Sequence, residues 1–185
     1  MRILIAGGTG LIGQPLIRSL VSNSHTVVVL SRSGRKIPAS PGISWMTWDA
    51  KTTSGWGSII NEIDGVINLA GHNIGRFPWS EKNKQQFRQS RLDAGYALVK
   101  AIEECQVKPR VFIQASAVGY YGPHGDEWVD ESVGAGDDFS ASLCLDWEAS
   151  TQAVEKLGLR RILIRTGIVL SNSGGVLPQM AFPAK

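Results

Sequence analysis

The sequence predicts a three-layer α/β Rossmann fold with a mostly parallel, doubly wound sheet. An apolar run over residues 1–6 breaks into glycines and resumes with helical spacing, which indicates a strand, a tight turn and a helix. Segments typical of strands and helices then alternate along the chain, as a parallel sheet with right-handed crossovers requires. With 185 residues, of which 43% are apolar, the chain is long enough for one well-packed domain.

The glycines after the first strand predict a dinucleotide site. Gly7, Gly10 and Gly13 follow a G-x-x-G-x-x-G spacing, and Gly8 forms G-x-G-x-x-G with the last two. Glycine serves there because the turn needs positive φ, the backbone approaches a pyrophosphate and the helix packs closely on the strand. A purely structural turn is the alternative, but the position between a strand and a helix favours binding. The residues expected at the pyrophosphate are Gly7, Thr9, Gly10, Leu11 and Ile12.

The second strand, residues 26–30, leads into a polar run over residues 31–36 that indicates which cofactor binds. An acidic residue here would bind the ribose 2′-hydroxyl of NAD, whereas arginine accommodates the 2′-phosphate of NADP. The sequence has Ser31 and Arg32, whose hydroxyl and guanidinium can both donate to a phosphate. We therefore predict NADP(H) in preference to NAD(H), with a solvated basic loop as the alternative.

Two further strands are expected on the cofactor half of the sheet. Residues 43–49 alternate as a short third strand, and Asp49 at its end should either accept a hydrogen bond from the adenine amino group or form a turn. A short helix over 56–62 precedes a buried fourth strand at 64–71. Its last residues, Leu69, Ala70 and Gly71, should border the adenosine ribose and the nicotinamide.

The segment that follows holds two candidates with open alternatives. His72 is either a catalytic or ligand-contacting group or a solvated loop residue. Ser80 should cap a helix that reaches about residue 105. On that helix, Arg91 is a candidate for contacting a cofactor or substrate phosphate, with an exposed helical arginine as the alternative.

The last third of the chain predicts two more strands. The fifth, residues 110–116, ends in Ser116 and is followed by an acidic loop at 125–138 and a helix at 140–157. The sixth, residues 161–165, continues through 166–170 to a flexible turn at 171–175. Ser116 and the backbone near Ile168 should lie toward the nicotinamide. We expect residues 1–170 to form the NADP-binding domain and 171–185 to begin a C-terminal substrate lobe that is largely missing.

Composition excludes several classes of function. The formal charge is only +3 and the basic residues are scattered, so nucleic acid is not an expected partner. Cys105 and Cys144 have no metal-ligand spacing, which indicates reduced thiols in a cytoplasmic protein without a bound metal. No run reaches transmembrane length, and no membrane partner is expected. The expected partners are a small-molecule substrate and a second copy in a homodimer.

Several motifs together resemble the short-chain dehydrogenase/reductase superfamily. They are the glycine turn, Asn-Leu-Ala-Gly at 68–71, Ala-Ser-Ala-Val-Gly-Tyr-Tyr-Gly at 115–122, Asp-Trp-Glu at 146–148 and Arg-Thr-Gly-Ile-Val-Leu at 165–170. The combination is similar to the atypical extended branch, the NAD-dependent epimerase/dehydratase or nucleoside-diphosphate-sugar epimerase family. The resemblance covers the whole chain. It implies a Rossmann domain that binds NADP(H), with a smaller C-terminal portion completing the substrate pocket.

The sequence departs from the catalytic pattern that this resemblance implies. Active members use a Ser or Thr at the fifth strand and a Tyr-x-x-x-Lys on the next helix. Aligned with them, Ala117 takes the hydroxyl position, and Ser140 and Cys144 take the Tyr and Lys positions. A second pattern, Tyr96 to Lys100, lies on the helix before the serine strand, which is the wrong helix for catalysis. These members also continue well beyond residue 185.

Two functions remain open from the sequence. One is an NADP(H)-dependent oxidoreductase or epimerase for an unknown hydroxylated or nucleotide-sugar-like substrate, with Ser116, Tyr120 or Tyr121 as substitute proton donors. In that case the cofactor carries out the hydride transfer, and the protein orients the substrate and manages one proton. The other is a non-catalytic NADP(H) sensor or interaction protein that lacks the Tyr/Lys pair.

Overall fold

The computed structural model describes residues 1–33, 40–75, 78–172, 174–175 and 177. Within them, six parallel strands form one sheet in the order β3-β2-β1-β4-β5-β6. Their bounds are β1 Arg2–Ala6, β2 Thr26–Ser31, β3 Ile43–Thr47, β4 Gly65–Asn68, β5 Val111–Ala117 and β6 Arg160–Thr166. The strand order reverses between β1 and β4, so the sheet is doubly wound and the predicted Rossmann fold is confirmed.

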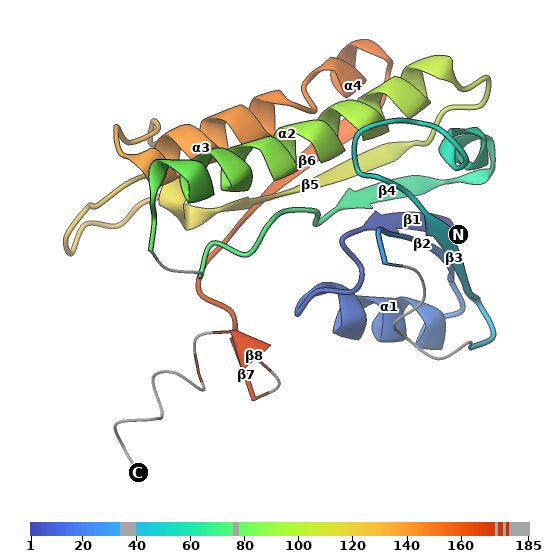
Figure 1. Cartoon of the computed structure of the whole chain (residues 1–185), viewed down its shortest axis with the longest axis horizontal. Coiled ribbons are helices and arrows are strands. Elements are labelled where there is room, and N and C mark those ends of the chain that lie inside the picture. Colours follow the sequence, from blue (N-terminus) through green and yellow to red (C-terminus); the bar gives the residue numbers. More distant parts are fainter. Residues whose placement is uncertain (34–39, 76–77, 173, 176, 178–185) are drawn as a thin grey trace.

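Helices cover the two faces of the sheet unequally (Figure 1). α1 (Gly13–Ser22) packs under β1 and β2, where Ile5, Ile17 and Val29 form one apolar cluster. α2 (Glu81–Glu104), α3 (Phe139–Ala149) and α4 (Ala153–Lys156) lie on the other face. The larger cluster lies there, and the 3₁₀ helix η1 (Gly57–Glu62) contributes Ile60 to it. The sheet lies between these two helical layers, and the carboxyl ends of its strands lie along one edge between them.

The predicted helix at 140–157 is interrupted. α3 ends at Ala149 and α4 begins at Ala153. Between them, the Ser150 hydroxyl donates to the carbonyl of Trp147 at 2.7 Å. Ser150 also packs so closely on α2 that a Cβ added at Gly95 would lie 2.2 Å from its Oγ. A side chain that bonds back to the helix while it is wedged against a neighbouring helix favours a break at this point.

The predicted continuation of the sixth strand through 166–170 is wrong. β6 ends at Thr166, which is paired with Ala117, the last residue of β5. Beyond this pair no neighbouring strand remains to accept hydrogen bonds, so the chain leaves the sheet. Leu170–Ser171 (β7) and Gly174–Gly175 (β8) instead form a short antiparallel pair. Most of the expected start of a C-terminal lobe, residues 173, 176 and 178–185, lies outside the described residues, so the boundary at residue 170 stays a prediction.

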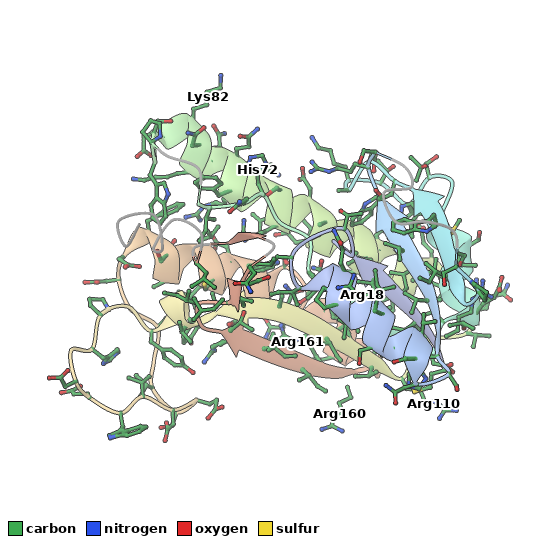
Figure 2. All side chains as sticks on the ribbon, turned by 90° about the horizontal axis from the view of Figure 1, so that it is seen from below. Arg18, His72, Lys82, Arg110, Arg160 and Arg161 are labelled. Atoms are coloured by element: carbon green, nitrogen blue, oxygen red, sulfur yellow. The ribbon has the colours of Figure 1, made fainter. Side chains whose placement is uncertain are left out.

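Charged side chains are spread over the surface. In Figure 2, Arg18 projects from α1, Lys82 from the start of α2, and Arg110 and Arg160 from the opposite end of the molecule. This dispersal agrees with the scattered basic residues of the sequence. Within the described part of the chain, no helix is long and apolar enough to cross a membrane.

Candidate functional site

A cleft of about 370 Å³ lies at the carboxyl ends of β1, β2 and β4, against α2. In a doubly wound sheet, this edge is the position where ligands bind. Nine of the residues predicted to bind the cofactor line it together: Gly7, Thr9, Gly10, Ser31, Arg32, Asp49, Leu69, Ala70 and Gly71. Segments far apart in the sequence thus converge on one cavity.

The glycine turn fits a dinucleotide because the lack of a side chain at Gly10 is not explained by close packing within the protein. Gly7 has φ +80°, and a Cβ on it would lie 2.5 Å from the Leu69 carbonyl oxygen. A Cβ on Gly13 would meet the backbone of Gly8 at 2.6 Å. At Gly10, by contrast, the added Cβ meets only the Gly7 oxygen, at 3.3 Å. Gly10 is exposed and lines the cleft, so its missing side chain leaves room for a ligand.

The helix after the turn presents its amino end without a side-chain cap. α1 begins at Gly13, and its N-cap residue, Ile12, makes no side-chain hydrogen bond. An uncapped amino end is suited to an anion. Ile12 is 39% exposed, and neither it nor Leu11 lines the cleft. A Cβ added at Gly175 of β8 would lie 3.0 Å from the Leu11 side chain, which places Leu11 against β8.

The predicted phosphate-binding residues lie at the end of β2. Ser31, the last residue of the strand, is 5% exposed, and Arg32 follows it at the rim of the cleft. Residues 34–36 of the predicted basic run lie outside the described residues. Asp49 accepts 2.8 Å hydrogen bonds from the backbone N–H groups of Lys51 and Thr52. These bonds, Thr52 first, hold the pKa of the Asp49 carboxyl below its usual value. Asp49 thus forms the turn that was one of its two expected roles, and because it also lines the cleft, the contact with adenine stays a prediction.

One wall of the cleft was not predicted. It comes from the first half of α2, through Gln86, Gln89, Ser90 and Asp93. Asp93 pairs with Lys51 of the opposite wall at 3.6 Å. The polar content of early α2 was the only available signal, and it does not show which polar face turns toward the cleft.

Arg91 is buried, which contradicts the alternative of an exposed helical arginine. Only 8% of it is exposed, and its Nη1 donates to the carbonyls of His72 and Phe87 at 3.1 and 3.0 Å. Its guanidinium stacks on Trp147 at 4.6 Å, while its Nε has no hydrogen-bond partner among the described residues. No described carboxylate pairs with it, and burial lowers its pKa to about 10.

Arg91 separates the cleft from a second cavity of about 300 Å³ at the carboxyl ends of β5 and β6. A Cβ added at Gly71, in the cleft, would lie 3.0 Å from Arg91 Cζ. The described residues that line this second pocket are Ile74, Trp79, Arg91, Ala117, Val118, Gly119, Phe139, Ser140, Leu143, Cys144, Trp147, Thr166, Gly167 and Ile168. Ile168 thus shares this pocket with Arg91 and lies apart from the nine predicted cofactor residues of the cleft, and its place beside the nicotinamide stays a prediction.

The three residues at the catalytic positions of the resemblance, Ala117, Ser140 and Cys144, all line this second pocket. Cys144 donates its thiol to the Ala117 carbonyl at 3.7 Å, and burial raises its pKa. The thiol is therefore protonated near neutral pH. These positions thus hold neither the phenol nor the ammonium of the Tyr-Lys pair, and the one hydroxyl among them, that of Ser140, lies at the Tyr position.

The predicted proton donors lie outside both cavities, in a partly buried network. The Ser116 hydroxyl donates to Glu148 at 2.6 Å and is 2% exposed. Glu148 also receives two hydrogen bonds from Arg165, at 2.9 and 3.0 Å. Arg165 Nη1 donates to the Tyr121 hydroxyl at 3.0 Å, and its guanidinium lies 3.4 Å from the Tyr120 ring. The hydrogen bonds to Glu148 are the main cause of a raised pKa at Arg165. The network joins α3, β5, β6 and η2 (Val118–Tyr120).

His72 and the Tyr96–Lys100 pattern differ in their position relative to the two cavities. His72 lines the cleft, with its backbone N–H bonded to Ser90 and its ring 6.0 Å from that of Phe87. Tyr96 is 56% exposed and Lys100 pairs with Glu104, so the Tyr-x-x-x-Lys pattern faces away from both cavities. No group of three metal-ligating side chains is present among the described residues.

Comparison with known proteins agrees with this geometry. The sequence profile of the NAD dependent epimerase/dehydratase family matches residues 3–173. An epimerase family protein of Mycobacterium leprae is 41% identical over 178 residues, which cover 96% of this chain and 56% of that protein. The human epimerase family protein SDR39U1, isoform 2, crystallised with NADPH, is 34% identical with a TM-score of 0.81, over 99% of this chain and 59% of that one.

A nucleoside-diphosphate sugar epimerase from Corynebacterium glutamicum also has a TM-score of 0.81, at 32% identity, and this chain covers 38% of it. The chain spans 56–60% of the length of the curated relatives it matches. The matches extend from β1 to β7 and include the glycine turn and both cavities. The chain therefore belongs to the NAD dependent epimerase/dehydratase family.

Proposed function

We propose that this chain binds NADP(H) along the carboxyl edge of its sheet and acts as a reductase or epimerase domain. The arrangement of the two cavities carries the proposal. The cleft holds the glycine turn and the Ser31–Arg32 pair, and the second pocket adjoins it past Gly71 and Arg91. A dinucleotide with its adenosine in the cleft would reach the second pocket with its nicotinamide.

The residues present fit such a cofactor. Gly10 leaves space beside the uncapped amino end of α1, where a pyrophosphate would lie. Arg32 would pair with the 2′-phosphate, and Arg91 would give a buried charge to the anionic cofactor. Bound NADP(H) supplies hydride chemistry. The chain's own residues bind and orient the cofactor, and the second pocket, whose lining is largely apolar, receives the substrate beside the nicotinamide.

The human SDR39U1 crystal structure was determined with NADPH, which supports the phosphorylated cofactor for this relative. In this chain, the support is the residue type at the end of β2. Arg32 is basic and Ser31 is a hydroxyl, and the sequence lacks the carboxylate that would hold a ribose 2′-hydroxyl there.

The test is a titration of NADPH against NADH. We expect NADPH to bind more tightly, and Arg32→Ala to cost about 1.5–3 kcal/mol for NADPH and little for NADH, because one charge-assisted phosphate contact is lost. Arg18→Ala, which removes an exposed arginine from the outer side of α1, is the matched control and should change neither affinity. Equal affinity of the wild-type protein for the two cofactors would sink the NADP assignment.

A non-catalytic sensor is the second candidate function. The observation that favours it is that Ala117, Ser140 and Cys144 occupy the places of the Ser-Tyr-Lys acid-base group. NADPH oxidation with a panel of carbonyl substrates separates the two functions, using this chain and a chain of the relatives' full length. Tight NADPH binding without turnover in either chain supports the sensor.

A further inference from the structure

The second pocket is lined differently from a sugar site. Its walls are aromatic and aliphatic, and Trp79 and Phe139 meet edge to face with ring centroids 5.7 Å apart. None of the described lining residues is Asp, Glu, Asn or Gln. Recognition of a sugar needs several hydrogen-bonding groups for its hydroxyls, and a buried hydroxyl without a partner is costly. The lining instead suits a flat, apolar molecule.

The few polar groups of the pocket are partly engaged already. Thr166 donates its hydroxyl to the Ser116 carbonyl at 3.0 Å, and the Cys144 thiol donates to Ala117. Ser140, in the first turn of α3, lines the pocket and can donate to one ligand oxygen. Arg91 adds a desolvated positive charge with no described carboxylate to neutralise it. The pocket thus combines apolar walls with a charge that stabilises an oxyanion.

The absence of the Tyr/Lys acid-base pair from this pocket limits which class of ligand could be reduced there. Hydride transfer to a simple ketone leaves an alkoxide, a base about as strong as hydroxide, so a positioned acid must protonate it. Hydride transfer to a quinone leaves a phenolate with a pKa of about 10, as for tyrosine, which water can protonate after the ring has become aromatic. A site without the Tyr/Lys pair is suited to the second acceptor.

We propose that the second pocket binds a flat quinone and reduces it with hydride from NADPH. One quinone oxygen would accept the hydride, two electrons and one proton, from NADPH, which becomes NADP⁺. The C=O π electrons move into the ring, which becomes aromatic, and the oxyanion left on the second oxygen takes a proton from water to give the hydroquinone. Arg91 stabilises the oxyanion and Ser140 donates a hydrogen bond to the other oxygen. The reduction rests on the NADP(H) binding proposed above, but the binding of the quinone does not.

Binding is tested first, without turnover. Duroquinone is a suitable probe because its four ring methyl groups hinder addition of a thiol such as that of Cys144. Trp79 and Trp147 lie in the pocket wall, so a bound quinone should quench tryptophan fluorescence saturably. Phe139→Ala removes one aromatic wall, and Val118→Asp places a charge at a lining residue that is 48% exposed and tolerant of substitution. Each should weaken binding at least about tenfold.

Leu145→Ala is the matched control, because this exposed residue lies on α3 outside the pocket and should leave the quinone affinity unchanged. UDP-glucose serves as the competing ligand. Saturable quenching that both pocket variants weaken, followed by NADPH oxidation on addition of duroquinone, supports the proposal. Quenching that is equal in wild type and variants, or binding of UDP-glucose but not duroquinone, overturns it. NADPH affinity is measured in a separate titration. A failure of the proposed NADP(H) binding can therefore be told apart from a failure of the proposed quinone binding.

Discussion

At the residue scale, Arg91 is the side chain whose environment is least favourable to the folded protein alone. Its charge is buried between Gly71 and Trp147 without a described carboxylate partner. Burial lowers the pKa of Arg91 from its ordinary value to about 10, which corresponds to about 3 kcal/mol of destabilisation of the charged form, at about 1.4 kcal/mol for each pKa unit. A ligand phosphate would offset this cost.

Arg91→Met should therefore separate stability from binding. We expect the free energy of unfolding in urea to rise by about 1–2 kcal/mol, because a desolvated charge is replaced by an apolar chain of similar length. NADPH affinity should fall at least about tenfold. Arg88→Met on the same helix is the control, and it should lower the free energy of unfolding. Arg88 pairs with Asp146 and donates to the Ser142 hydroxyl at 2.9 Å, and the substitution removes both interactions. Loss of stability in both variants would contradict the account.

The pH dependence provides a second readout of Arg91. The unfolded chain keeps the proton on this group up to the ordinary, higher pKa of an arginine, whereas burial lowers the pKa in the folded protein to about 10. Between these values the unfolded state binds more protons, so the contribution of Arg91 to stability rises with pH and is lost again as pH falls through about 10. The stability difference between Arg91→Met and wild type should accordingly narrow as the pH is raised above about 10.

At the element scale, the turn between β1 and α1 contains glycines that serve different purposes. The turn is closed by a hydrogen bond from the Gly10 N–H to the Gly7 oxygen at 3.1 Å. Gly13 is fixed by contact with the Gly8 backbone, which cannot move aside. Gly10 has the most room of these glycines, since an added Cβ would meet only the Gly7 oxygen, at 3.3 Å, and it lines the cleft.

Paired substitutions should show this division. Gly13→Ala is expected to lower the free energy of unfolding by about 2 kcal/mol or more, because the new methyl overlaps backbone atoms. Gly10→Ala should change stability by less than about 0.5 kcal/mol and yet weaken NADPH binding about tenfold or more. Urea unfolding and NADPH titration of both variants provide the check. Normal NADPH affinity in Gly10→Ala would show that no ligand approaches the turn closely.

At the scale of the whole molecule, hydrophobic periodicity and glycine spacing predicted the features that depend only on neighbouring residues in the sequence. The strand, turn and helix at residues 1–22 were recognisable from periodicity and glycine spacing. The end of β6 was not, because it depends on where β5 stops, more than forty residues earlier in the chain. Ser116 was predicted as a proton donor, yet Glu148, 32 residues later, accepts its hydrogen bond. Pairing partners of this kind come from tertiary structure, which sequence spacing does not record.

The unequal helical cover leaves part of the sheet bare. On the α1 side, no described helix lies over β5 and β6 (Figure 1). Ile164 is 45% exposed there and pairs in register with Ala115, beside the Ile113–Ile162 pair. We propose that this apolar face drives the homodimer expected from the sequence.

Ile164→Lys should weaken self-association measured by analytical ultracentrifugation over a range of concentrations. Its free energy of unfolding should change by less than about 1 kcal/mol, because nearly half of the side chain is exposed to solvent already. Leu145→Lys, on the exposed side of α3, should leave association unchanged. A wild-type protein that stays monomeric at every concentration would contradict the proposal.

β6 is an edge strand among the described strands, and its side chains influence which further strand could pair with the sheet. It pairs with β5 on one side and is the last strand of the sheet, so its other row of N–H and C=O groups is open to a further strand. Three of its seven residues, Arg160, Arg161 and Arg165, are arginines. Arg161 and Arg165 are already paired with Glu155 and Glu148, whereas Arg160 is exposed at the start of the strand. An incoming strand would therefore meet one exposed positive charge at this edge and, beyond it, two arginines whose charge is already neutralised.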